Sequence, residues 1–157
     1  MKVSLIVVGK TDFKYLDEGI TLYEGRIKHY VPFEIIYTKD IKKSQSLSRD
    51  KIKEAECSEI INKIKPSDFV VLLDEKGKEL SSINFSNFLN DKMISGEKKI
   101  VFLLGGAYGF HENVYKRANN ILSISKMTFS HQMVRLIFLE QLYRAFTIIK
   151  GEPYHHV

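Results

Sequence analysis

The sequence has a single cysteine and no long apolar run. Cys57 alone can form neither an intramolecular disulfide nor a zinc site built from cysteines, which is typical of a reducing compartment. No apolar stretch approaches the ~18 residues that cross a bilayer, and residues 3–8 are too short for the core of a signal peptide. These absences exclude a disulfide-stabilised secreted fold and a membrane protein, so we expect a cytoplasmic protein.

Internal repeats and low-complexity tracts are also lacking, whereas material for a hydrophobic core is plentiful. The chain has 157 residues, of which 44% are apolar and 27% charged, a balance typical of globular proteins and not of disordered ones. Two domains of this total length would each be too small to bury a sizeable core. We therefore expect residues 1–157 to form a single domain.

Basic residues outnumber acidic ones, with 24 Lys and Arg against 19 Asp and Glu, which gives a formal charge of +5. The C-terminal third is relatively cationic, because residues 110–157 contain 6 basic and 3 acidic residues. The same third holds four of the five histidines, at positions 111, 131, 155 and 156. An anionic partner such as RNA would suit this end of the chain, although excess lysine also occurs as ordinary solubilising surface.

Short apolar bursts alternate with longer segments of helical periodicity. The bursts, rich in Val, Ile and Leu, predict strands at residues 3–8, 33–38, 69–73, 100–104 and 121–124. The segments between them predict helices at residues 15–29, 48–64, 83–93, 111–118 and 131–150. Residues 39–49 are polar and basic without periodicity and predict a loop, either solvated surface or an anion-binding flap. Such alternation is typical of an α/β fold with a parallel sheet.

Three glycines follow the fourth predicted strand, in the segment Gly105-Gly106-Ala107-Tyr108-Gly109. The spacing does not match the G-x-G-x-x-G dinucleotide motif, because Ala107 stands at its second glycine, and no G-K-[ST] of a P-loop follows. Glycines at a strand end let the main chain approach a flat or anionic ligand closely, and ligands of open parallel sheets bind at this end. A tight strand-to-helix turn explains the glycines equally well.

The loop before the last predicted helix reads SISKMTFSHQMVR, residues 123–135. Ser130 is a candidate cap of that helix, and His131 lies at its start. The free N–H groups of a helix start suit an anion and favour the neutral form of a histidine, which can then act as a base. The alternative is an ordinary capped helix with an incidental histidine.

Three sequence blocks together resemble a known family: LLGGAYGF, LSISKMTFSHQMVR and EQLYRAFTIIKGEPYHHV. Over essentially its whole length the chain is similar to the ribosomal RNA large subunit methyltransferase H family, a minimal member of the SPOUT class. One departure is Ser130, where members of the family usually have proline before the histidine. His131 stays in register with the family's histidine.

The resemblance implies a parallel five-stranded sheet flanked by helices, with the C-terminal part in a deep trefoil knot. It also implies a homodimer that uses S-adenosylmethionine, and no metal, to methylate N3 of a pseudouridine in 23S rRNA of the assembled ribosome. The residues at the positions of the family's cofactor contacts are Leu73, Gly105, Ile124, Ser125, Lys126, Met127, Thr128 and Phe129. The catalytic candidates are His131, Tyr154 and His155, with Arg135 as a clamp for an anion or a phosphate.

The last predicted helix, 131–150, has apolar side chains on nearly every face, which indicates that it is covered on more than one side. A second copy of the chain is one possible cover, and a place under the chain's own sheet is the other. Function also has alternatives, because a non-catalytic RNA- or ribosome-binding module would explain the basic C-terminal third. A nucleotide-binding regulator is a further alternative. Only the methyltransferase requires S-adenosylmethionine.

Overall fold

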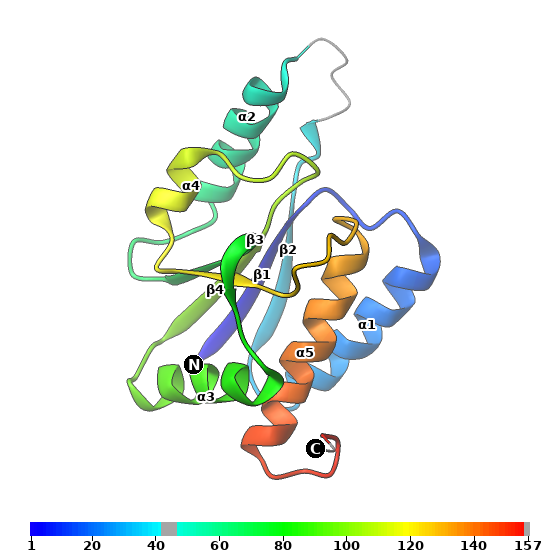
Figure 1. Cartoon of the computed structure of the whole chain (residues 1–157), viewed down its shortest axis with the longest axis vertical. Coiled ribbons are helices and arrows are strands. Elements are labelled where there is room, and N and C mark those ends of the chain that lie inside the picture. Colours follow the sequence, from blue (N-terminus) through cyan, green and yellow to red (C-terminus); the bar gives the residue numbers. More distant parts are fainter. Residues whose placement is uncertain (42–46, 156–157) are drawn as a thin grey trace.

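Parallel strands form one sheet within the described residues, which are 1–41 and 47–155 of the computed structural model (Figure 1). The strands are β1 (Lys2–Val8), β2 (Phe33–Thr38), β3 (Phe69–Glu79), β4 (Lys99–Leu104) and β5 (Asn120–Ser123). The helices are α1 (Lys14–Lys28), α2 (Arg49–Ile61), α3 (Ser82–Ile94), α4 (Glu112–Arg117) and α5 (Met133–Ile149). The strand order is β2-β1-β4-β3-β5, and every neighbouring pair is parallel. The predicted α/β fold with a five-stranded parallel sheet is confirmed.

The predicted elements all occur, with shifts at their ends. Helix α2 begins one residue later than predicted, because Ser48 is its cap and accepts a hydrogen bond of 3.4 Å from the N–H of Lys51. It also ends earlier, at Ile61, and α5 begins two residues later than predicted, at Met133. Of the predicted loop 39–49, residues 42–46 lie outside the described residues.

Strand β3 is longer than the predicted 69–73, because it continues through the charged residues 74–79. After a register shift, Lys78 pairs with Leu122 and Glu79 with Ser123 of β5. Gly77 permits this close passage, since a Cβ atom there would lie 2.4 Å from the main-chain carbonyl carbon of Leu122. No strand was predicted here, because residues 74–79 have no apolar alternation.

Helices cover both faces of the sheet. Helices α1, α3 and α5 lie on one face, and α2 and α4 lie on the other (Figure 1). In β1, Val3, Leu5 and Val7 belong to the core beneath the first group, whereas Ile6 and Val8 belong to the core beneath the second. Burial on both faces explains why the strands are continuous apolar runs in the sequence.

Helix α5 is central in its layer, between α1 and α3 (Figure 1). Its buried side chains, among them Phe138, Leu142 and Phe146, pack in the core between the helices and the sheet. The place under the chain's own sheet, one of the two covers considered for this helix, is therefore confirmed. Met133 and Ile137 stay partly exposed, so some apolar surface of α5 remains available to another cover.

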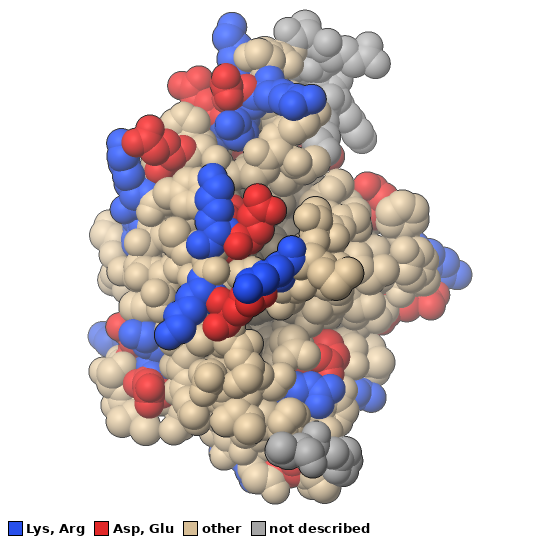
Figure 2. Space-filling view, in the orientation of Figure 1, with Lys and Arg blue, Asp and Glu red and all other residues tan. Residues whose placement is uncertain are grey.

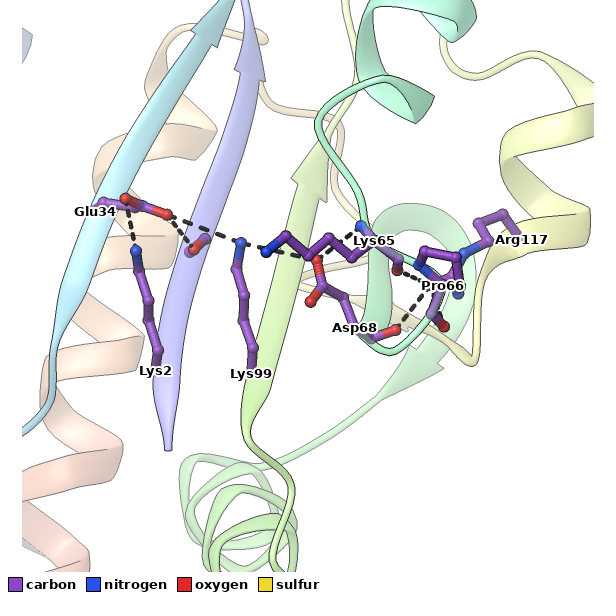
Figure 3. Close-up of polar contacts among 8 residues, drawn as sticks. Lys2, Glu34, Lys65, Pro66, Asp68, Lys99 and Arg117 are labelled. Atoms are coloured by element: carbon purple, nitrogen blue, oxygen red, sulfur yellow. Dashed lines mark hydrogen bonds and ion pairs between the residues drawn. The ribbon is translucent and has the colours of Figure 1, made fainter.

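A charged network joins the amino ends of neighbouring strands (Figure 3). The Glu34 carboxylate lies 2.9 Å from Lys2 Nζ and accepts a hydrogen bond of 2.8 Å from the buried Ser4 hydroxyl. Lys99 Nζ lies between two carboxylates, 3.9 Å from that of Glu34 and 3.7 Å from that of Asp68. This network lies at the edge opposite to the carboxyl ends of the strands, where ligands of such sheets bind.

Arg117, at the end of α4, fastens the turn that leads into β3 (Figure 3). Its guanidinium donates hydrogen bonds of 2.8 Å to the main-chain carbonyls of Lys65 and Asp68, and one of 3.3 Å to that of Pro66. The Asp68 carboxylate in turn accepts a hydrogen bond of 3.0 Å from the N–H of Lys65. This edge of the sheet is therefore a structural element, and its charges are engaged within the fold.

We expect acidification to lower the free energy of unfolding more steeply in the parent protein than in a Glu34→Gln variant. The hydrogen bond from Lys2 lowers the pKa of Glu34 below its ordinary value. Such a carboxylate stabilises the fold above its unfolded-state pKa of ~4.3, and the stabilisation is lost as pH falls through the folded-state pKa. Thermal unfolding at neutral pH and at a series of acidic pH values measures the difference. Glu18→Gln, in an exposed ion pair with Lys14, is the control, and identical pH slopes for parent and Glu34→Gln would contradict this prediction.

Candidate functional site

Leu73 of β3 lies between the carboxyl ends of β4 and β5, which are each followed by a loop. Leu73 of β3 is in register with Leu104 of β4 on one side and with Leu122 of β5 on the other. The glycine turn that begins at Gly105 follows β4, and the loop that begins at Ile124 follows β5. The two loops singled out in the sequence therefore leave the same edge of the sheet, which is the edge where ligands bind in open parallel sheets.

An apolar hollow opens between this edge and helices α3 and α5. Its lining residues are Leu73, Leu80, Phe85, Leu122, Ser123, Ile124, Phe138 and Gln141. Two predicted cofactor contacts, Leu73 and Ile124, are among them. Apolar walls with a few polar groups are what a flat heterocycle such as adenine requires.

The loop after β5 is held by its own hydrogen bonds. Ser123 Oγ donates a hydrogen bond of 3.0 Å to the carbonyl of Ser125, whose hydroxyl accepts one of 2.9 Å from the N–H of Met127. The side chains of Met127 and Phe129 are 76% and 38% exposed. The loop therefore presents main chain and apolar side chains outside the hollow, and among the predicted contacts only Ile124 of this loop lines it.

Gly105, the first residue of the turn after β4, does not line the hollow. A Cβ atom at Gly105 would lie 3.3 Å from the ring of Phe110, which packs in the core beneath α2 and α4. The turn closes with a hydrogen bond of 3.1 Å from the N–H of Gly109 to the carbonyl of Gly106. Gly109 has φ +74°, a conformation that favours glycine. A tight turn thus explains Gly109, and the main chain of Gly105 continues the strand next to Leu73.

His131 lies half-buried at the start of α5. Ser130, predicted as the cap of this helix, accepts a hydrogen bond of 3.1 Å from the N–H of Met133, although the N-cap position of α5 is Gln132. A ring nitrogen of His131 lies 3.5 Å from Nε2 of Gln132. The histidine is therefore part of the folded helix start.

Arg135 is buried, with only 2% of its surface exposed. Its guanidinium donates hydrogen bonds of 2.6 and 3.1 Å to the carbonyls of Val8 and Gly9, and one of 3.3 Å to the Thr11 hydroxyl. The same group donates one of 3.2 Å to the carbonyl of His131. Since these donors are engaged within the chain, the geometry favours a positioning role of Arg135 over the predicted role of anion clamp.

Gln132, which was not among the residues predicted from the sequence, also joins the start of α5 to the loop after β1. Its side-chain N–H group donates hydrogen bonds of 3.1 Å to the carbonyl of Lys10 and to the Asp12 carboxylate, and its oxygen accepts one of 3.2 Å from the N–H of Asp12. It is 5% exposed. Only its place next to His131 could have pointed to it, because the partner loop lies about 120 residues earlier in the sequence.

The tail after α5 packs back onto the helix. The Tyr154 hydroxyl lies 3.3 Å from that of Tyr23 and donates a hydrogen bond of 3.2 Å to Glu140. Burial and these neighbours raise the pKa of Tyr154. The Arg144 guanidinium stacks 4.8 Å from the Tyr154 ring centroid and lies 3.4 Å from Nδ1 of His155. The tail residues Tyr154 and His155 are therefore held in defined positions.

The predicted catalytic residues form two groups that do not meet within one chain. Tyr154 contacts Glu140 and Tyr143, which follow His131 by 9 and 12 residues. At about 1.5 Å per helical residue, this separation along the axis of α5 is on the order of 14 Å or more. His131 and Arg135 lie at the start of α5, whereas Tyr154 and His155 lie beside its middle.

Basic and acidic side chains alternate over the face shown in Figure 2, where no single basic patch stands out. Several lysines are in ion pairs, for example Lys126 with Glu79 at 3.8 Å and Lys116 with Glu112 at 2.7 Å. Within residues 1–41 and 47–155, no helix is both long and apolar enough to cross a membrane. In the same part of the chain, no three His, Cys, Asp or Glu residues are grouped as metal ligands would be.

Known proteins of one family are similar to the chain over its whole length. The family model described as "Predicted SPOUT methyltransferase" matches residues 1–155. The protein named Ribosomal RNA large subunit methyltransferase H from Parabacteroides distasonis is 54% identical over 156 residues, which are 99% of each chain. Proteins of the same name from Christiangramia forsetii and Cytophaga hutchinsonii are 52% and 51% identical over 156 residues, at least 99% of each chain. The chain therefore belongs to the ribosomal RNA large subunit methyltransferase H family of SPOUT methyltransferases, as its three sequence blocks predicted.

Proposed function

We propose that the protein transfers a methyl group from S-adenosylmethionine to N3 of a pseudouridine in 23S rRNA of the assembled ribosome. The observation that carries this proposal is the apolar hollow at the carboxyl edge of the sheet, which includes Leu73 and Ile124. The chain belongs to a methyltransferase family, and its relatives are named as methyltransferases of large-subunit ribosomal RNA. Both findings support rRNA methylation. An rRNA substrate in turn supports a cytoplasmic location.

The residues present fit the adenosine part of the cofactor. Leu73, Leu122 and Phe138 supply apolar walls for the adenine. The main chain of Gly105 and of residues 124–129 would supply hydrogen bonds at the rim, which is why the site shows no charged sequence motif. When bound, S-adenosylmethionine supplies an activated methyl group, so the chain's own task is to orient the acceptor and to accept its proton.

The imide nitrogen of pseudouridine is a poor nucleophile while it carries its proton. A base within hydrogen-bond reach of N3, or a cation that stabilises the anion, would assist the transfer. We propose His131, Tyr154 and His155 for contacts with the base. Tyr and His rings also stack on an extruded nucleotide, which suits an enzyme that reads a single-stranded loop. Arg135 acts on the reaction indirectly, because it positions His131 by donating a hydrogen bond to the main-chain carbonyl of His131.

We propose a homodimer, because a second copy of the chain could bring the two groups of catalytic candidates together. Within one chain the start of α5 and the tail are on the order of 14 Å or more apart. The partly exposed Met133 and Ile137 provide apolar surface on the same helix for such an interface. Light scattering at micromolar concentration should give twice the chain mass of 18.2 kDa, and a monodisperse monomer would contradict the homodimer.

The trefoil knot stays a proposal that rests on family membership. It is supported by the close passage of β5 beside Gly77 of β3, and by the return of the chain after β5 into α5 between α1 and α3. The proposed knot would gather β3, the turn after β4 and the loop after β5 around the hollow. This arrangement would explain how a chain of 157 residues builds a cofactor site without a further domain.

The experiment that tests the proposed function has two parts. Calorimetric titration with S-adenosylmethionine should show binding, whereas a non-catalytic RNA-binding module would show none, and a nucleotide-binding regulator would prefer nucleotides. The protein and labelled S-adenosylmethionine are then incubated with ribosomes, separated subunits or free rRNA from cells that lack the enzyme, and the methyl group is mapped. We expect one pseudouridine of 23S rRNA to be labelled, and assembled ribosomes to react best. No binding at millimolar ligand would contradict the proposal.

A further inference from the structure

Helix α2 holds a carboxylate against the glycine turn that follows β4. Glu56 lies in the middle of this largely polar helix and is only 3% exposed. A Cβ atom built at Gly106 would lie 2.8 and 2.9 Å from the two oxygens of the Glu56 carboxylate. The Glu56 carboxylate therefore lies next to the turn at Gly106 and fills the space that a side chain there would need.

This contact is not an incidental feature of surface packing. Burying a carboxylate is costly, so the place of Glu56 beside this turn calls for a specific structural or functional reason. Gly106 has no positive φ, so an alanine there would be acceptable to the backbone. The obstacle to a side chain at Gly106 is therefore the Glu56 carboxylate itself, and the two residues fit each other.

A second contact joins the same helix to the same turn. The guanidinium of Arg49, the first residue of α2, lies 5.4 Å from the ring centroid of Tyr108. Helix α2 thus touches the turn through Arg49 near its start and through Glu56 one and a half to two turns later. The turn is held from the face of the sheet opposite to the hollow, because α2 and α5 cover opposite faces.

We propose that Glu56 is a positioning residue of the methyl-donor site, which holds the turn 105–109 so that the main chain of Gly105 faces the donor. This inference rests on the proposed function, because it assigns the turn to the binding of S-adenosylmethionine. Glu56 acts through the turn and does not touch the donor. Its side chain fixes the turn from behind, while the hollow beside Leu73 and Ile124 receives the ligand.

The test compares Glu56→Gln, which keeps the size of the side chain, with Glu54→Gln, which changes an exposed glutamate of the same helix. Calorimetry should show about tenfold weaker binding of S-adenosylmethionine to Glu56→Gln, equivalent to about 1.4 kcal/mol, and unchanged binding to Glu54→Gln. Without ligand, amide hydrogen exchange of residues 106–109 should be faster in Glu56→Gln alone. Parent affinity in Glu56→Gln together with unchanged exchange would overturn the proposal, as would a lower melting temperature with unchanged affinity.

A double-mutant cycle tests the contact itself. Gly106→Ala places a methyl group against the Glu56 carboxylate and should weaken binding about tenfold. In a Glu56→Ala background the methyl group has room, so Gly106→Ala should there cost nothing further. Additive losses would overturn the direct contact, and if Glu56→Ala fails to fold, Glu56→Gln and Gly106→Ala still decide the case. A parent protein that binds no S-adenosylmethionine, with exchange still faster in Glu56→Gln, would contradict the proposed function while retaining the contact with the turn.

Discussion

Deletion of residues 153–157 should reduce methyl transfer to ribosomes at least ~100-fold while leaving the affinity for S-adenosylmethionine near its original value. Such a loss corresponds to about 3 kcal/mol of activation free energy, which is typical when oriented contacts to the reacting base are removed. Binding should persist because none of the described tail residues, 153–155, lines the hollow beside Leu73 and Ile124. Single-turnover methylation and calorimetry on the same preparation measure the two quantities.

The packing of the tail is the physical reason for this expectation. Tyr154 is held by Tyr23 and Glu140, and Arg144 lies against both Tyr154 and His155. These contacts fix the two rings in position before any substrate binds, and ring placement of this kind lowers the entropy cost of reaching the reactive geometry.

A matched control for the deletion is Tyr154→Phe, which removes the hydroxyl and keeps the ring. If the ring stacks on the nucleotide, this variant should lose less activity than the deletion. Circular dichroism and melting temperature must show that the deleted chain is folded. A folded, truncated enzyme that methylates ribosomes at the full rate would show that the tail is dispensable, and would return the catalytic assignment to the start of α5.

The strands could be predicted because their signal lies in consecutive residues of the sequence. A strand buried on both faces is a continuous apolar run, and Val3, Leu5 and Ile6 are buried whichever face they point to. The continuation of β3 could not be predicted, because residues 74–79 are charged and their strand conformation depends on β5, which lies over 40 residues later. Gly77 was the only local hint, and a glycine in a charged segment is equally typical of a turn.

Of the cofactor contacts predicted by resemblance, Leu73 and Ile124 line the hollow, and the roles of the others stay predictions. The hollow also includes Gln141 and Phe138, whose helical periodicity marked them only as part of an apolar helix. The burial of Glu56 was equally invisible, because α2 is polar overall and its partner Gly106 lies 50 residues later. Which side chain opposes which main chain is decided by the sheet order, and that order follows from the whole chain.

The expected result for Arg135→Met is a loss of about 3 kcal/mol or more in the free energy of unfolding, together with reduced methyl transfer. Methionine fills similar space but leaves the carbonyls of Val8 and Gly9 without the donors that Arg135 provides. Hydrogen bonds to a charged donor contribute about 1.5–3 kcal/mol each, and buried acceptors that lose a partner add their desolvation cost. Urea unfolding measures the change, with Lys14→Met at an exposed position as the control.

This variant also separates the two roles considered for Arg135. An anion clamp acts only on the RNA, so its removal would weaken ribosome binding and leave unfolding unchanged. A positioning residue connects α5 to the loop after β1 in the free protein, so its removal should lower stability and disturb His131, whose carbonyl it holds. Arg135→Lys should recover little, because a single ammonium group cannot reach the oxygens of Val8, Thr11 and His131 that the planar guanidinium spans. If Arg135→Met were as stable as the parent but bound ribosomes more weakly, the result would support the role of anion clamp and contradict the positioning role.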